Sequence, residues 1–386
     1  MFKSLSILFL CAALYAPPAF AQGASSQDFS ASGPVAYIYV SSAPRKPNPD
    51  AVFGFAAAAN GALTPIPNSP LGLNESLIAS SPTTVVGFNA HTLSFDSFQI
   101  ASDGSLSYAS SISCVQNDYG CESVYTMTFD NAGADVYVNE QFAGSGYSTN
   151  SFSVDGSSGS LTYLGVLLAL WDNSNISFMH NDVLAFSFDQ ISCAYDSLDE
   201  FRRQSNGMLV LTQSHFQQPI PPPNVSLYYA DIAAADPAGN YVAMVEQPVN
   251  PPYDCDAGYP VQIAAYTVES NGDLNTNSTY QNMPSTPIID PQDMKISPSG
   301  KLLAVGGEEG LQIFHFNGSQ PVTHYTGLLT TDPIAQLFWD NSDHLYALSR
   351  GGLYVLTVTP DSITNAPGSP HSIAFLQGLA VQPLVH

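Results

Sequence analysis

Residues 297–319, SPSGKLLAVGGEEGLQIFHFNGS, decide the fold, because they hold two strands with a turn on either side. The turn residues 297–300 come first, and the apolar run 302–305 follows. The connector 306–310 then leads into an alternating strand that ends at the turn Asn317-Gly318. Proline and glycine fix or permit turn dihedrals, and alternation is typical of a half-buried strand. The stretch predicts one pair of strands. Similar stretches recur along the chain, and their number and spacing predict the fold.

A turn of the Gly-x-Leu type recurs along the chain at intervals of roughly 40 to 65 residues, a spacing typical of β-propeller blades. The copies begin at Gly61, Gly104, Gly159, Gly207 and Gly272, with two degenerate copies at Gly318 and Asp361. Each unit holds a turn of the Asp-Pro-Ala-Gly kind, an apolar strand and an alternating strand. A two-sheet sandwich, the alternative, would not repeat seven times, so we predict an all-β, seven-bladed β-propeller.

The two ends of the chain predict how the ring closes. Residues 378–382 are typical of the innermost strand of a blade, and nothing comes after them to complete that blade. Residues 36–40 are typical of a second strand that lacks an innermost one. We therefore expect the N- and C-terminal strands to pair in one blade, which leaves no open sheet edge in the ring.

The first residues predict export. Lys3, the apolar residues 7–15 and the small-x-small site Ala19-Phe20-Ala21 are typical of a cleaved signal peptide over 1–21. We expect a flexible segment over 22–34 and a single propeller domain over 35–386, in a secreted or periplasmic, bacterial-type protein. The longest later apolar run, 161–171, is too short to span a bilayer, so no membrane insertion is expected.

The charge balance narrows the class of partner. Eight Lys and Arg residues face 32 Asp and Glu residues, for a formal net charge of −24. Such a surface repels phosphate backbones and anionic lipids, so we expect no nucleic-acid partner and a protein that is a monomer. Four cysteines follow the leader: Cys114, Cys121, Cys193 and Cys255. They predict two disulfides. Three pairings are possible, and Cys114–Cys121, which would close a short loop, is the favoured local one. A zinc site is the alternative, but the cysteines lack the spacing typical of zinc ligands.

Three segments of the first unit, residues 36–42, 52–55 and 61–71, resemble the blade signature of the lactonase-like seven-bladed propellers. That group includes the cycloisomerase-type 6-phosphogluconolactonases and the YVTN-repeat surface proteins. The resemblance covers nearly the whole mature chain and implies the propeller fold. It also implies lactone hydrolysis as one candidate activity, although one fold hosts unrelated functions.

The chain departs from this family where the innermost strands begin. The resemblance implies Arg and His after a proline there, but Gln292 and Asp293 follow Pro291 in the sixth unit. The third unit enters through residues 121–125 without a histidine. A phosphorylated lactone needs cationic groups to hold its phosphate, and the residues at these positions do not supply them. No family catalytic residue therefore carries over to this chain.

Loop lengths predict which face of the ring carries the binding site. In a propeller the connections between second and third strands share a face with the blade-to-blade crossovers, which we call the long-loop face. Its long connectors are expected at 41–50, 139–149 and 246–259. The expected binding residues there are Tyr119, Tyr147, Tyr253, Asp254, Asp256 and Tyr259. Rings beside carboxylates suit carbohydrate or peptide, while tyrosines that pack on their own loops are the alternative.

A second set of candidates is expected near the ring axis on the sixth and seventh blades. Asp290 and Asp332 are candidate binding residues, and Asp293, Glu308 and Arg350 are weak catalytic candidates. A general acid/base pair would need two carboxylates in differing environments. A structural calcium ion, the one candidate cofactor, would need six or more convergent oxygens. Solvated turn acids are the alternative, and no other cofactor or metal is expected.

Two functions are consistent with these features. The first is an exported recognition module for a glycan, peptide or envelope partner, which binds through the long-loop face. The second is a hydrolase of unphosphorylated sugar lactones or related esters. The carbohydrate, lactone or protein partner itself is not identified by the sequence.

Overall fold

A computed structural model describes residues 33–42, 51–114, 123–142, 146–169, 176–179, 182–189, 197–212, 215–250 and 258–384. Residue contacts divide the chain into two units, Met1–Gly33 and Pro34–His386, and every strand of the described residues belongs to the second unit. No helix of the described residues is long and apolar enough to cross a membrane.

The unit Pro34–His386 is built from four-stranded antiparallel sheets, each of which runs from an innermost strand outward. Blade 1 holds β28 (Leu376–Pro383), β1 (Ala36–Ser42), β2 (Ala51–Ala57) and β3 (Leu63–Pro65). Blade 2 holds β4 (Leu77–Ser80), β5 (Thr84–Asn89), β6 (Ser94–Ile100) and β7 (Leu106–Ser113). Blade 3 holds β8 (Ser123–Phe129), β9 (Asp135–Phe142), β10 (Gly146–Val154) and β11 (Leu161–Ala169).

The remaining blades have the same order. Blade 4 holds β12 (Ser177–Phe178), β13 (Leu184–Asp189), β14 (Ser197–Arg203) and β15 (Leu209–Thr212). Blade 5 holds β16 (Leu227–Ala235), β17 (Tyr241–Val249), β18 (Gln262–Val268) and β19 (Leu274–Asn275). Blade 6 holds β20 (Pro291–Ile296), β21 (Leu302–Gly307), β22 (Gly310–His315) and β23 (Thr323–His324). Blade 7 holds β24 (Ile334–Trp339), β25 (His344–Ser349), β26 (Gly352–Thr359) and β27 (Ser362–Asn365).

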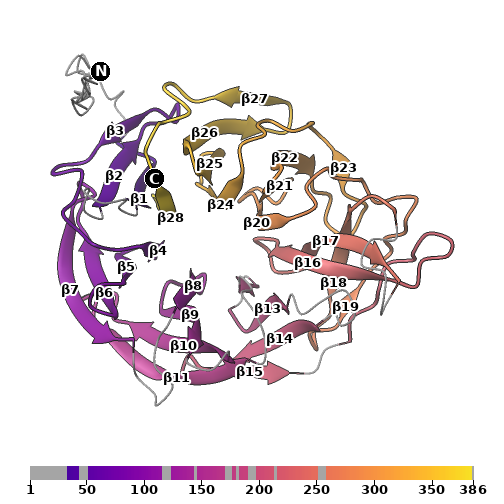
Figure 1. The fold of residues 1–386 in the computed structure, drawn as a ribbon, viewed down its shortest axis with the longest axis horizontal. Helices are drawn as coiled ribbons and strands as arrows, with labels where there is room; N and C mark the ends of the chain where they lie inside the picture. The colour runs from indigo at the N-terminus through magenta and orange to yellow at the C-terminus, as the bar shows by residue number, and fades with distance from the viewer. Residues whose placement is uncertain are drawn as a thin grey trace, which may run out of the picture. The chain divides into compact units, whose positions relative to one another are not determined.

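These seven sheets form a closed ring, which confirms the predicted fold. The chain runs once round it in Figure 1, from indigo at β1 to yellow at β28, so the first and last strands lie side by side. The ladder between them runs from Ala36 opposite Pro383 to Ser42 opposite Leu376, and the Leu384 amide donates to the Val35 carbonyl at 2.8 Å. The predicted pairing of the terminal strands in one blade is therefore confirmed.

The core lies between neighbouring blades, which explains why the run 302–305 is apolar throughout. Leu303 and Val305 pack in a cluster with residues of blade 5, while Leu302 and Ala304 pack with residues of blade 7. All four are fully buried, because both faces of a blade are covered. Each such leucine stabilises the fold by roughly 1.5–3 kcal/mol relative to an exposed one.

The glycine of the Gly-x-Leu turn has a specific structural reason. Gly104 and Gly207 adopt φ of 79° and 85°, in the left-handed region that favours glycine. Their carbonyls accept hydrogen bonds from tyrosines of the preceding blade, Tyr39 Oη at 2.7 Å and Tyr137 Oη at 2.7 Å. The repeated turn is therefore both a tight turn and a contact between blades.

Candidate functional site

The long-loop face is built by the connections between second and third strands together with the crossovers. In blade 6 the two meet directly, because the Glu308 amide in the connection from β21 to β22 donates to the carbonyl of Asp290 at the end of a crossover, at 3.1 Å. Residues 43–50 and 251–257, within two of the three predicted long connectors, lie outside the described residues.

The third predicted long connector, residues 139–149, is wrong. Residues 139–142 and 146–149 lie instead in β9 and β10, where Asn139 pairs with Thr149 and Glu140 pairs with Ser148. Their polar side chains bond to one another across the two strands: Thr149 Oγ1 donates to Asn139 Oδ1 at 2.6 Å. Tyr147 accordingly lies in a strand, with its ring 6.1 Å from that of Tyr125.

Crossovers are held firmly against the third strands in several blades. The crossover into blade 7 pairs with the start of β22, where Leu329 donates to Leu311 and Leu311 donates to Thr330. The crossover into blade 1 pairs with the start of β26 in the same way, through His371 and Leu353. Because backbone hydrogen bonds fix them, these crossovers offer a pre-ordered surface for a partner.

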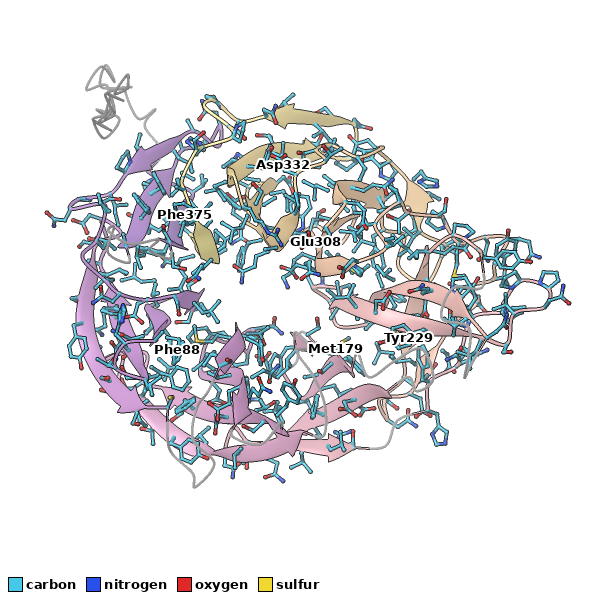
Figure 2. All side chains as sticks on the ribbon, viewed as in Figure 1. Phe88, Met179, Tyr229, Glu308, Asp332 and Phe375 are labelled. Carbon is cyan, nitrogen blue, oxygen red and sulfur yellow. The ribbon has the colours of Figure 1, made fainter. Side chains whose placement is uncertain are left out.

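Four predicted or neighbouring residues meet at the inner edge of blades 6 and 7. Glu309 Oε2 accepts from the amides of Ile289 and Asp290 at 3.2 and 3.4 Å. Arg350 Nη2 lies 3.1 Å from Glu308 Oε1, and the Arg350 side chain is 77% exposed. Figure 2 shows Glu308 on the inner side of the ring. We call Asp290, Glu308, Glu309 and Arg350 the rim cluster.

Asp332 lies outside the rim cluster, on the crossover into blade 7 (Figure 2). Its Oδ2 accepts a hydrogen bond from Tyr354 Oη at 2.5 Å, which raises the pKa of Tyr354 above its ordinary value. Asp332 thus joins the crossover to β26, and its carboxylate stays exposed at the surface of the long-loop face.

Asp293, predicted near the axis as a weak catalytic candidate, lies in the innermost strand β20 and is buried. Its side chain is almost inaccessible, at 5% for the residue. Oδ2 accepts from the Leu337 amide of blade 7 at 2.7 Å, and Oδ1 accepts from the Met294 amide and lies 2.9 Å from Lys295 Nζ. A β-bulge in β20 leaves Gln292 out of the ladder, because the pairing skips from Pro291 to Asp293.

The residue left out of each ladder by such a bulge is a feature that the sequence did not reveal. Five innermost strands carry a bulge at the corresponding place: β8, β16, β20, β24 and β28. The bulged residues are Tyr125, Asp231, Gln292, Ala335 and Gln377. The last three are exposed and sit on the blades that carry the rim cluster and on the next blade of the ring.

Large apolar side chains are exposed on three successive crossovers of the long-loop face. Ile289, Leu328, Leu329 and Phe375 are 61%, 37%, 38% and 43% exposed, and all four lie in the crossovers into blades 6, 7 and 1. Phe375 also adopts φ of 58°, which is unusual for a bulky residue. We call these four residues the apolar patch.

The remaining predicted residues lie apart from the rim cluster or outside the described residues. Tyr259 packs on its surroundings, with its ring 5.5 Å from that of Tyr280 and its hydroxyl donating to the Pro223 carbonyl at 3.1 Å. Tyr119, Tyr253, Asp254, Asp256, Cys121, Cys193 and Cys255 lie outside the described residues. Cys114 is buried and disulfide-bonded, and its predicted pairing with Cys121 stays a prediction.

Sequence reasoning also missed a buried carboxyl, Glu140, on the side of blade 3 that packs against blade 2. Burial raises the pKa of Glu140 to about 7, although Asn150 and Ser148 donate to its Oε1 at 2.5 and 3.3 Å. In the part of the chain that the structure describes, no group of three or more His, Cys, Asp and Glu side chains is placed to hold a metal.

No protein-family model and no curated protein matches the chain. Solved structures do match over most of its length. A proposed 6-phosphogluconolactonase from Bacteroides uniformis is 13% identical, with a TM-score of 0.62 over 90% of this chain and 99% of that one. The periplasmic gluconolactonase of Pseudomonas aeruginosa is 14% identical, with a TM-score of 0.60 over 91% and 99%. The Chaetomium thermophilum protein Sqt1, solved bound to the N-terminus of the ribosomal protein L10, is 12% identical, with a TM-score of 0.50 over 85% of this chain and 82% of that one. The chain therefore resembles lactonase-like propellers in fold, at low sequence identity.

Proposed function

We propose that this protein is a recognition module that binds its partner through the long-loop face over blades 6, 7 and 1. The apolar patch carries the proposal. Soluble proteins rarely expose large apolar side chains together without a use, and crossovers that are fixed by backbone hydrogen bonds hold these ready at low entropic cost. The residues 1–21 suggest that binding takes place outside the cytoplasm.

The rim cluster fits binding better than hydrolysis. Glu309 is engaged by two backbone amides, Glu308 by Arg350 and Asp290 by Gln292, so each carboxylate of the rim cluster already has a partner. A general base must instead be placed to take a proton from its substrate. Arg350 is paired with Glu308, which leaves it less able to stabilise a developing negative charge.

Hydrolysis of unphosphorylated lactones is the second candidate, since two of the similar structures are described as lactonases. That likeness concerns the fold, and the same scaffold also serves binding, as in the propeller described as bound to a ribosomal protein terminus.

Purified protein assayed against a lactone panel and against glycan and peptide arrays separates the two candidates. We expect no lactone turnover above the buffer rate, and array binding that falls about tenfold or more when Phe375→Ala is combined with Leu329→Ala. Leu211→Ala, an exposed change on the outer strand β15, serves as the control and should leave binding unchanged. Turnover that Arg350→Gln or Glu308→Gln abolishes would contradict the proposal in favour of hydrolysis.

A further inference from the structure

We infer that the partner is an extended peptide segment in which Lys or Arg residues are combined with large apolar residues. The inference rests on the proposed function and names the class of partner for the same surface. Three properties of the described residues support it: the kind of apolar side chain, the sign of the charge and the amides near the axis.

The apolar patch favours peptide over carbohydrate. Sugars are held by aromatic rings that present a flat face, but the patch consists of one phenylalanine with an isoleucine and two leucines. Two described tyrosines that were predicted to bind carbohydrate or peptide lie beside other rings, Tyr147 with Tyr125 and Tyr259 with Tyr280, and they do not belong to the apolar patch. Branched aliphatic side chains suit the apolar side chains of a peptide.

Charge complementarity sets the sign of the partner. The Ile289 amide donates to Glu309 Oε2, and the Leu329 amide donates to the carbonyl of Leu311, two residues after Glu309. Asp290, Glu308 and Asp332 are all exposed beside these apolar residues, on a chain whose formal net charge is −24. Such a surface attracts a cationic segment and repels an anionic one.

The bulges supply groups that can bond a peptide backbone. Gln292 and Gln377 are exposed at the bulges of β20 and β28, on either side of β24. A glutamine amide both donates and accepts, as a passing peptide unit requires. Gln292 Nε2 lies 3.0 Å from Asp290 Oδ1, so one bulge is already linked to the rim cluster.

Arg350 gives the inference a sharp test, because it competes with a cationic partner for Glu308. Replacing Arg350 by glutamine frees that carboxylate and removes a like charge. We therefore expect Arg350→Gln to bind a cationic peptide about threefold to tenfold more tightly. A lactonase that uses Arg350 would be impaired by the same change.

The probe is a short fluorescent peptide in which lysines alternate with leucines and serines, measured by fluorescence anisotropy against the whole protein. Two matched peptides carry glutamate in place of lysine, or serine in place of leucine. We expect the lysine–leucine peptide to bind and both matched peptides to bind at least about tenfold more weakly, with the affinity falling as salt screens the charges.

Protein variants locate the site. Asp290→Asn combined with Glu308→Gln, and separately Phe375→Ala, should weaken binding about tenfold. Asp361→Asn, an exposed acid in the turn between β26 and β27 on the opposite face, and Leu211→Ala should leave it unchanged. All of these changes are at exposed side chains, and circular dichroism verifies that each variant is folded.

The outcomes are distinct. Equal binding of the glutamate peptide, weaker binding by Arg350→Gln, or loss of binding with the control variants overturns the inference. If the lysine–leucine peptide does not bind but a glycan or another ligand binds in a way that depends on Phe375, the inference fails while the proposed function stands. Lactone turnover without any binding of this kind overturns both.

Discussion

At the scale of single residues, Asp293 is a carboxylate that joins two blades, with one oxygen on the Leu337 amide and the other beside Lys295. Replacing Asp293 by alanine leaves the Leu337 N–H buried without an acceptor. The cost of such a group is about 1–3 kcal/mol, so we expect Asp293→Ala to lower the free energy of unfolding by about that amount in a urea titration.

A nearby exposed acid provides the control for this experiment. Asp290 lies three residues away, and its carboxylate is exposed, so Asp290→Asn should change the free energy of unfolding by less than about 0.5 kcal/mol. If Asp293→Ala is as harmless as Asp290→Asn, the carboxylate does not hold the blades together, and a role at the axis would have to be reconsidered.

Glu140 predicts a pH dependence whose sign is set by its burial. Its pKa is raised to about 7 in the folded protein from the ordinary value of 4.5, so between these values the folded state binds more protons than the unfolded state. The contribution of Glu140 is therefore most favourable at low pH, and it is lost as pH rises through about 7. The total loss is about 3 kcal/mol.

Glu140→Gln removes this titration, so the difference in unfolding free energy between variant and wild type is the quantity to measure. Relative to its value at pH 5, the difference should shift in favour of the variant by up to about 3 kcal/mol at pH 8. Asp361→Asn, a change at an exposed side chain, should show no such shift. A difference that stays constant from pH 5 to pH 8 would mean that Glu140 does not titrate in this range.

Residues of the candidate site were predictable in part. Asp290, Glu308 and Arg350 stand at turns, where the sequence places charged residues in solvent, and the structure places them together. The burial of Asp293 could not be assigned in the same way, because its carboxylate accepts from the Leu337 amide of the next blade, and alternation along one strand does not show contacts between blades.

At the scale of elements, two neighbouring glycines test how the crossovers are held. A Cβ on Gly352 would meet the His371 carbonyl oxygen of the crossover at 2.6 Å, whereas one on Gly351 would meet Ser349 Oγ at 3.9 Å. Gly352→Ala should therefore push the crossover off β26 and lower the free energy of unfolding by more than about 2 kcal/mol.

The control is the adjacent change, Gly351→Ala, which has room for the methyl group and should cost less than about 1 kcal/mol in the same titration. Equal effects of the two substitutions would show that close packing of the crossover does not govern stability at this blade. Amide exchange at Leu353, which bonds to His371, should rise in the first variant and not in the second.

The strands were largely predictable from alternation and turn residues, and the failure at residues 139–149 has a physical cause. Glu140, Ser148 and Asn150 are polar although each is at most 1% exposed, and Ser148 and Asn150 donate to Glu140 Oε1 across β9 and β10. A sequence pattern equates burial with apolar residues and cannot show that polar side chains will meet on paired strands.

At the scale of the whole molecule, the number of blades was predictable because each blade repeats the same arrangement of turns and strands. The turn glycines take a left-handed φ and the apolar run of blade 6 is buried on both faces, so the same residue types recur along the chain, although Asp361 replaces the glycine in the last unit. The closure was predictable for the same reason, since 36–40 and 378–382 each lacked a neighbour that the other could supply.

The ring predicts that blade 1 opens first, because its two innermost strands, β28 and β1, come from opposite ends of the chain and are not consecutive in it. Joining residue 384 to residue 34 by a short turn makes the backbone circular and supplies that missing connection. In the chain-entropy account, closing a loop of this size stabilises a protein by up to about 5 kcal/mol, so the cyclic protein should unfold at a higher denaturant concentration than a linear chain of the same residues.

In the linear chain, amides of β1 and β28 should exchange faster than those of β21, because local opening exposes the weakest unit first. Cyclisation should remove that difference. If the amides of β1 and β28 in the linear chain are already as protected as those of β21, blade 1 is not where the ring opens, and the stability of the molecule must be attributed to all seven blade interfaces alike.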